Sequence, residues 1–252
     1  NQIAANSIET FLDNQLDVTF RFQTGPFAHT LVAGIEGARE TSDPIRPSFT
    51  GVPETNLLNP DTNQAFAGTS TISSAVHTTA WSYGAYSMDS MKLSAKWNLT
   101  GGIRWDYFDT DYLQSVSPSS AFTRIDEQPT YRAALVYTPT QNSSIYFDYG
   151  TSFDPSAESL SLSASTADLP PEQNRTFELG GKWDTLSGRT SLRAALFSTE
   201  KTNAREPDPD NPLLDVLAGV ERGNGFELEQ QGHLTSRWEV LASYALAREQ
   251  GS

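Results

Sequence analysis

The sequence contains no cysteine, few charged residues and no long apolar run, and each of these absences excludes a class of protein. Without cysteine, the chain has no disulfide scaffold, no thiolate metal site and no cysteine nucleophile. Its apolar runs are shorter than the ~18 residues that a membrane-spanning helix requires. Together with the mean hydropathy of -0.45, this excludes a helical membrane protein. Acidic residues (31) outnumber basic residues (17), and the net charge of -14 argues against a nucleic-acid partner.

The chain is rich in aromatic residues (11%), and apolar and polar residues alternate along it with a period of two. In the segment 97–107 the odd positions are apolar or glycine, whereas the even positions are polar or glycine. The segments 16–23 and 176–183 alternate in the same way, and 238–244 supplies a further apolar face. Successive side chains of a strand point to opposite faces, so the pattern predicts strands with one apolar and one polar side.

Ten strands are predicted from this pattern, and most are 11 residues long or longer. They span 13–23, 28–41, 76–90, 95–112, 127–138, 143–153, 173–185, 190–201, 219–231 and 236–249. Strands of soluble proteins cluster near ~5–6 residues, whereas a tilted strand that crosses a membrane needs ~9–11. The lengths therefore favour membrane-spanning strands.

The connections between these strands alternate between short and long. The short ones are 24–27, 91–94, 139–142, 186–189 and 232–235; the long ones are 42–75, 113–126, 154–172 and 202–218. Phe22, Tyr137 and Trp183 come just before short turns, and Trp97 and Trp238 come just after them. Tight turns at one edge, extended loops at the other and an aromatic girdle near the turns are typical of outer-membrane β-barrels.

Several motifs resemble one family in their order and spacing. They are Gly84–Asp89 (GAYSMD), Gly101–Asp106 (GGIRWD), Phe177–Trp183 (FELGGKW) and Arg222–Glu229 (RGNGFELE). Together these motifs resemble the barrel of TonB-dependent siderophore receptors, particularly the ferric-catecholate branch. The resemblance covers about residues 10–250.

The resemblance implies an active importer in the bacterial outer membrane, with a 22-stranded barrel, a plug domain in the lumen and energy supplied by TonB. We expect residues 1–252 to form an all-β, antiparallel, up-and-down segment of such a barrel, without the plug domain or the remaining strands. About ten strands patterned for a wider barrel should form an open, curved sheet. The implied partners are a ferric-siderophore complex, the TonB system through the plug domain, and outer-membrane lipid. The resemblance implies neither a cofactor nor an enzymatic activity.

The cargo of this branch is anionic, yet the long loops carry 12 acidic residues against three arginines. Attraction of the cargo must therefore be local, from a cationic side chain beside rings that can stack on a catechol. The predicted ligand-contacting residues are Arg39, Arg46, Phe49, Phe66, Tyr112, Phe122, Arg124, Lys201 and Arg205. The alternative for each is a solvated charge or a ring that packs within a loop. Polar residues on the inward faces are expected to line a wet lumen.

Other functions are compatible with parts of the pattern. A receptor of the same family could carry haem, cobalamin or a sugar, and His77 is the one histidine placed to serve a haem receptor. A ten-stranded outer-membrane protease or lipase would need a histidine cluster, which the dispersed His29, His77 and His233 supply poorly. A soluble β-sandwich would bury its rings centrally instead of near the strand ends. The acidic run 206–210 is interrupted by prolines and favours a solvated loop over a calcium site.

Overall fold

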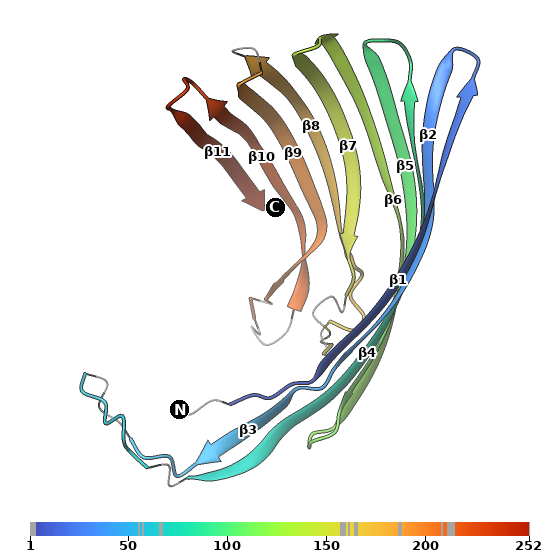
Figure 1. Ribbon diagram of the computed structural model, residues 1–252. Coiled ribbons are helices and arrows are strands. Elements are labelled where there is room, and N and C mark those ends of the chain that lie inside the picture. Colours follow the sequence, from blue (N-terminus) through green and yellow to red (C-terminus); the bar gives the residue numbers. More distant parts are fainter. Residues whose placement is uncertain are drawn as a thin grey trace.

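The chain forms a single curved antiparallel sheet of eleven strands (Figure 1). This computed structural model describes residues 4–54, 56, 58–65, 68–156, 160, 162–163, 166–185, 188–207, 209–210 and 215–251. The strands are β1 (Glu9–Thr24), β2 (Phe27–Ser42), β3 (Ile45–Thr50), β4 (Thr69–Lys92), β5 (Trp97–Gln114), β6 (Ser120–Thr140), β7 (Ser143–Asp154), β8 (Glu172–Thr185), β9 (Thr190–Pro207), β10 (Asp215–His233) and β11 (Glu239–Gly251). Within these residues, no helix is long and apolar enough to cross a membrane.

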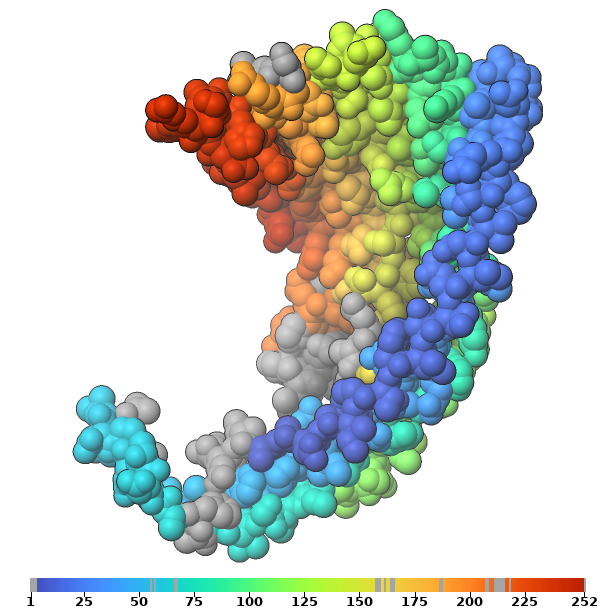
Figure 2. Space-filling model, viewed as in Figure 1, coloured from blue at the N-terminus to red at the C-terminus, as the bar shows by residue number. Residues whose placement is uncertain are grey.

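The sheet is open, as predicted. Its strand order is β1-β2-β4-β5-β6-β7-β8-β9-β10-β11, so each long strand pairs with its neighbours in sequence, and only β3 branches off, against β4. Over the described residues β1 and β11 do not pair with each other, and Figure 1 places them at opposite ends of the curve. Figure 2 shows the hollow that the curved sheet encloses between these ends.

The short and long connections lie at opposite edges of the sheet. Tight connections such as 25–26 and 93–96 define the turn edge, where Gly25 has a φ of 59° that a residue with a Cβ adopts only at a cost. The long connections, such as 51–68 and 155–171, define the loop edge, whereas the predicted long loop 113–126 is reduced to 115–119 because β5 and β6 continue into it. This alternation confirms the up-and-down arrangement predicted from the sequence.

The aromatic and aliphatic side chains of the long strands form no central core. Trp183 is 58% exposed and Leu179 is 52% exposed, although both belong to the regular part of β8. Across the described chain only five apolar residues are buried. The apolar faces are therefore turned outward on one side of a single sheet, which contradicts a β-sandwich and fits a surface that lipid covers.

The ten predicted strands are all present, and several continue further toward the loop edge than the alternation suggested. β6 begins at Ser120 instead of 127, and β9 continues to Pro207 instead of 201. The strand that sequence did not predict is β3, a short segment inside the predicted loop 42–75 that forms a hairpin with β4. A strand outside the lipid needs no apolar face. The apolar–polar alternation therefore ends before the strands do, although their backbones remain paired toward the loop edge.

Candidate ligand-contacting face

The face of the sheet inside the curve, here called the concave face, carries a row of paired polar side chains. Arg104 of β5 contacts Glu36 of β2 and forms an ion pair of 2.5 Å with Asp106. On β6 and β7, Arg132 pairs with Asp148 at 2.9 Å. The opposite, convex face of the same strands carries the exposed apolar residues. The two-sided pattern predicted from the sequence is therefore present, with the charges on the inner side.

Glycines on the concave face allow tyrosines to lie flat across the neighbouring strand. A Cβ at Gly34 would collide with the ring of Tyr86, whose hydroxyl donates a hydrogen bond to Asp17 two strands away. The same arrangement joins Gly180 of β8 and Tyr146 of β7. The glycines remove the steric obstacle, so the phenol groups reach partners along the sheet and fix the polar surface of the concave face.

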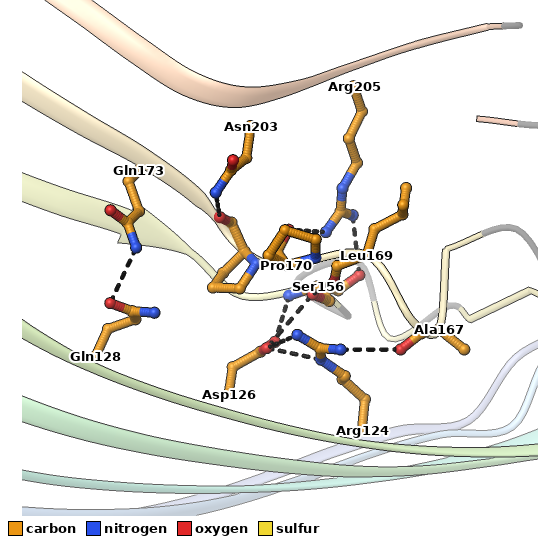
Figure 3. Close-up of polar contacts among 11 residues, drawn as sticks. Arg124, Asp126, Gln128, Ser156, Ala167, Leu169, Pro170, Gln173, Asn203 and Arg205 are labelled. Carbon is orange, nitrogen blue, oxygen red and sulfur yellow. Dashed lines mark hydrogen bonds and ion pairs between the residues drawn. The ribbon is translucent and has the colours of Figure 1, made fainter. Parts of the chain in front are cut away.

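One long connection folds back onto the concave face. We call its described residues (155–156, 160, 162–163 and 166–171) the inner loop; Figure 1 shows it inside the curve, and Figure 3 shows its contacts. The backbone N–H of Ser156 donates to Asp126 Oδ2 at 2.7 Å, and Arg124 Nη1 donates to the carbonyl of Ala167 at 3.2 Å. Arg124 and Asp126 are themselves joined by an ion pair of 2.7 Å. Since the Asp126 side chain is fully buried, this pair is the innermost anchor of the loop.

Strand β9 holds the inner loop from its other side. Arg205 donates to the carbonyls of Ser156 (3.2 Å) and Pro170 (3.3 Å), and the side-chain amide of Asn203 donates to the carbonyl of Pro171 (3.0 Å) (Figure 3). Asn203 has a φ of 58° and lies at an irregularity in the β9–β10 pairing. That irregularity directs the end of β9 toward the loop, so two strands distant in sequence hold one segment between them.

Nine of the buried residues that the structure describes lie near the loop edge, on the inner loop and on the strands around it. Those on β4, β5 and β6 share the concave face, and the others belong to the inner loop and to β9. The nine are Val76, Thr78, Ala80, Thr110, Asp126, Ser156, Leu162, Ala167 and Ala204. Burial here fixes the loop as part of the barrel wall, so that it narrows the lumen at the loop edge.

Three of the predicted ligand-contacting residues lie together beside this loop. Tyr112 of β5 and Phe122 of β6 are paired in the register, with their ring centroids 6.0 Å apart. Arg124 follows Phe122 by two residues and therefore shares its face. In the structure Arg124 positions the inner loop, because its guanidinium forms an ion pair with Asp126 and donates a hydrogen bond to the carbonyl of Ala167.

Lys201 and Arg205 also lie at the loop edge of the concave side. Lys201 forms an ion pair of 2.8 Å with Glu172, and the hydrogen bond that it donates to this carboxylate raises the pKa of Lys201. A cavity of about 600 Å³ opens beside Lys201 and is also lined by Phe197, Glu221 and Glu249. Its lining includes one aromatic residue and two cationic residues, Lys201 and Arg222, among several acidic groups, which suits a large ligand with several polar atoms better than a simple anion.

The other predicted ligand-contacting residues are separated from this group. Arg39 lies on the convex face, with its guanidinium 5.4 Å from the centre of the Trp81 ring. Arg46 and Phe49 belong to β3, which projects beyond the loop edge (Figure 1). Phe66 lies outside the described residues. The sequence thus predicted several cationic and aromatic candidates, and the fold divides them among three surfaces.

The anchoring residues Asp126, Ser156 and Asn203 were not recognised as such from the sequence. Asp126 counted as one of many acidic loop residues, and Ser156 lies in a run of serines. Their roles depend on contacts between residues 30 or more apart in sequence, which residue type does not reveal. Within the described residues, no group of acidic or histidine side chains is arranged to hold a metal ion.

An open, two-faced sheet of membrane-length strands with tight turns at one edge defines a segment of an outer-membrane β-barrel. Residues 2–252 match the family model described as TonB dependent receptor-like, beta-barrel. The chain belongs to this family, which confirms the resemblance inferred from the motifs. The barrels of this family lie in the bacterial outer membrane.

Several of the similar proteins are named as siderophore receptors. The chain is 30% identical to the probable TonB-dependent siderophore receptor PiuA of Acinetobacter baumannii, over 96% of this chain and 36% of that protein. It is 27% identical to the catecholate siderophore receptor Fiu of Escherichia coli, over 92% of this chain and 34% of that protein. The crystal structure of PiuA superposes with a TM-score of 0.85 at 28% identity, covering 97% of this chain and 39% of that one.

The closed form of the ferric-catecholate import receptor Fiu gives a TM-score of 0.81 at 25% identity, over 97% of this chain and 38% of that chain. The chain thus spans about a third of the length of the curated relatives it matches. These homologues are transport receptors.

Proposed function

We propose that this chain forms part of the barrel wall of a TonB-dependent receptor that imports a ferric siderophore, of the catecholate type, across the outer membrane. The observation that carries the proposal is the concave face, where the Tyr112–Phe122 pair lies beside an inner loop fixed by Arg124 and Arg205. The similarity to receptors named for siderophores and catecholates supports the cargo class.

In this function the chain supplies surfaces and no covalent chemistry. The rings of Tyr112 and Phe122 offer stacking surfaces for catechol groups. Arg124 and Arg205 act as positioning residues, because their guanidiniums hold the loop that borders these rings. Lys201 supplies positive charge at the edge of the neighbouring cavity. The receptor then needs no resident cofactor, and TonB would act through a plug domain elsewhere in the longer protein.

Uptake of radioactive iron tests this function in the full-length receptor, expressed in a strain that lacks other siderophore receptors. A ferric tris-catecholate should be imported in the presence of TonB and not in its absence, while a ferric hydroxamate and haem should be imported poorly. Equal uptake of all three cargoes, or uptake that does not depend on TonB, would contradict the proposal. Preferential uptake of haem would show that the cargo of the receptor is haem and not a siderophore.

A further inference from the structure

A cluster of arginines lies on the convex face near the loop edge; one of them, Arg222, also borders the 600 Å³ cavity beside Lys201. The register places Arg175 of β8 beside Glu200 of β9, and Glu200 beside Arg222 of β10. Arg248 of β11 lies on the same face, two residue pairs closer to the turn edge, opposite Asn224. We call Arg175, Glu200, Arg222 and Arg248 the arginine cluster.

The depth of the arginine cluster places it at the outer boundary of the membrane. Arg175 is eight residues from Trp183, the girdle residue at the turn edge of the same strand. With a rise of ~3.4 Å per residue and a strand tilt of ~40°, Arg175 lies about 21 Å above Trp183, close to the top of an apolar band ~25 Å tall. The last convex aromatic residue of β8 is Phe177, two residues below. Long arginine side chains at this depth reach the lipid head groups.

The arginines of the cluster keep donors free for a ligand. Arg175 Nη2 contacts Glu200 Oε1 at 2.7 Å, and Arg222 Nε donates to Glu200 Oε2 at 2.9 Å. The side chains of Arg175 and Arg222 remain 54% and 57% exposed, and Arg248 has no ion-pair partner among the described residues. Each guanidinium has five N–H donors, and three arginines around one carboxylate leave a net charge of +2.

This positive charge is local. The chain as a whole carries -14, and at the corresponding ends of β5 and β6 the convex face bears Asp109, Asp111 and Glu127 instead. Glu200 contacts both Arg175 and Arg222 and orients these two arginines, while the remaining positive charge of the cluster is available to an anion.

A cavity of about 400 Å³ adjoins the arginine cluster. It lies where the β6–β7 pairing ends at Arg132 and Gly150, so the two strands diverge toward the loop edge. Three aromatic residues, Tyr131, Tyr149 and Phe153, line it together with polar residues that include Arg175 and Glu200. A hollow that combines aromatic rings with polar side chains and Arg175 suits an amphipathic molecule whose anionic group reaches the arginines.

We propose that the arginine cluster binds the phosphate of an outer-leaflet glycolipid, with the apolar part of the lipid against the convex face and the adjoining cavity. The arrangement favours phosphate because a planar guanidinium fork pairs with two phosphate oxygens at once. Lipid is favoured over a free anion because the cluster faces the bilayer and lies at head-group depth. This interaction is independent of the cargo carried through the lumen.

The test uses the full-length receptor in nanodiscs that contain diphosphoryl lipid A, the phosphorylated glycolipid of the outer leaflet. The test variant is Arg175→Gln/Arg222→Gln/Arg248→Gln. Its matched control, Arg21→Gln/Arg132→Gln/Arg193→Gln, removes the same charge from the opposite face. Native mass spectrometry after extraction counts the retained lipid, and heat-modifiable electrophoretic migration confirms that each barrel is folded.

We expect the test variant to retain diphosphoryl lipid A at least about ten-fold more weakly than the unsubstituted receptor, since each arginine near an anionic lipid surface adds binding energy. The control should retain it normally, and dephosphorylated lipid A should bind equally to all three proteins. Equal retention of diphosphoryl lipid A by test variant and control would overturn the proposal. The proposal would also be overturned if the test variant lost dephosphorylated lipid A as strongly as diphosphoryl lipid A, because phosphate would then not be the recognised group.

Discussion

Removing the carboxylate of Asp126 should release the inner loop while leaving the barrel folded. In Asp126→Ala, the backbone N–H of Ser156 and two donors of Arg124 lose their acceptor. Breaking a buried ion pair on one side costs ~3–5 kcal/mol; the Arg124 side chain is 19% exposed, which favours the lower end of this range. A loss of about 3 kcal/mol raises the opening equilibrium of the loop about 150-fold.

Hydrogen exchange of the full-length receptor measures this opening directly. Amides of residues 166–169 should lose protection by about two orders of magnitude, whereas those of β5 and β6 should change little. The matched control is Asp148→Ala, which breaks the more exposed pair with Arg132 and should change local protection by no more than ~1 kcal/mol. An Asp126→Ala loop that exchanges as slowly as the unsubstituted one would show that Asp126 does not hold it.

Three further results are expected. Replacing both rings (Tyr112→Ala/Phe122→Ala) should weaken binding of a ferric tris-catecholate about 10-fold in a fluorescence-quenching titration, and unchanged affinity would exclude the ring pair from the site. Gly34→Val should destabilise the barrel by about 1–3 kcal/mol in urea unfolding because the new methyl groups meet a tyrosine ring, whereas Gly101→Val, with open space around it, should not; equal effects would contradict the packing argument. The pKa of Lys201 is raised by its carboxylate partner, so the pair contributes at neutral pH and is lost only as the pH rises through that raised value. The difference in Tm between the unsubstituted receptor and Lys201→Gln should therefore be the same at pH 7 and pH 9, and a difference that disappears by pH 9 would show that the sign of this shift is wrong.

The fold could be predicted from the sequence where lipid dictates the pattern. In β7, predicted over 143–153 and observed over Ser143–Asp154, both faces are specified for nearly the whole strand. β3 was missed because it pairs above the membrane, where the sequence needs no apolar alternation. The inner loop was missed for another reason. Its position depends on the burial of Asp126 and on the turn of the chain at Asn203, and neither follows from residue type or spacing.

The candidate site was predicted in part. The fold brings Tyr112, Phe122 and Arg124 to one region, because adjacent antiparallel strands place paired residues side by side. Arg39 was grouped with the loop candidates by its position near a strand end, yet the parity of β2 turns it to the convex face. Counting alternate positions from the apolar face of β2 would have placed Arg39 on the convex face and removed it from the candidates. That Arg124 and Asp126 together hold the inner loop could be seen only in the structure.

The account depends on the two faces of this sheet meeting different media, and spin labels at neighbouring positions of β8 test this most directly. Glu178→Cys and Leu179→Cys, each labelled in the full-length receptor within lipid bilayers, should give opposite accessibilities. The label at 178 should be relaxed by a water-soluble nickel reagent, and the label at 179 should be relaxed by oxygen dissolved in lipid. Equal relaxation of both labels by the nickel reagent would contradict a strand that separates lipid from a wet lumen.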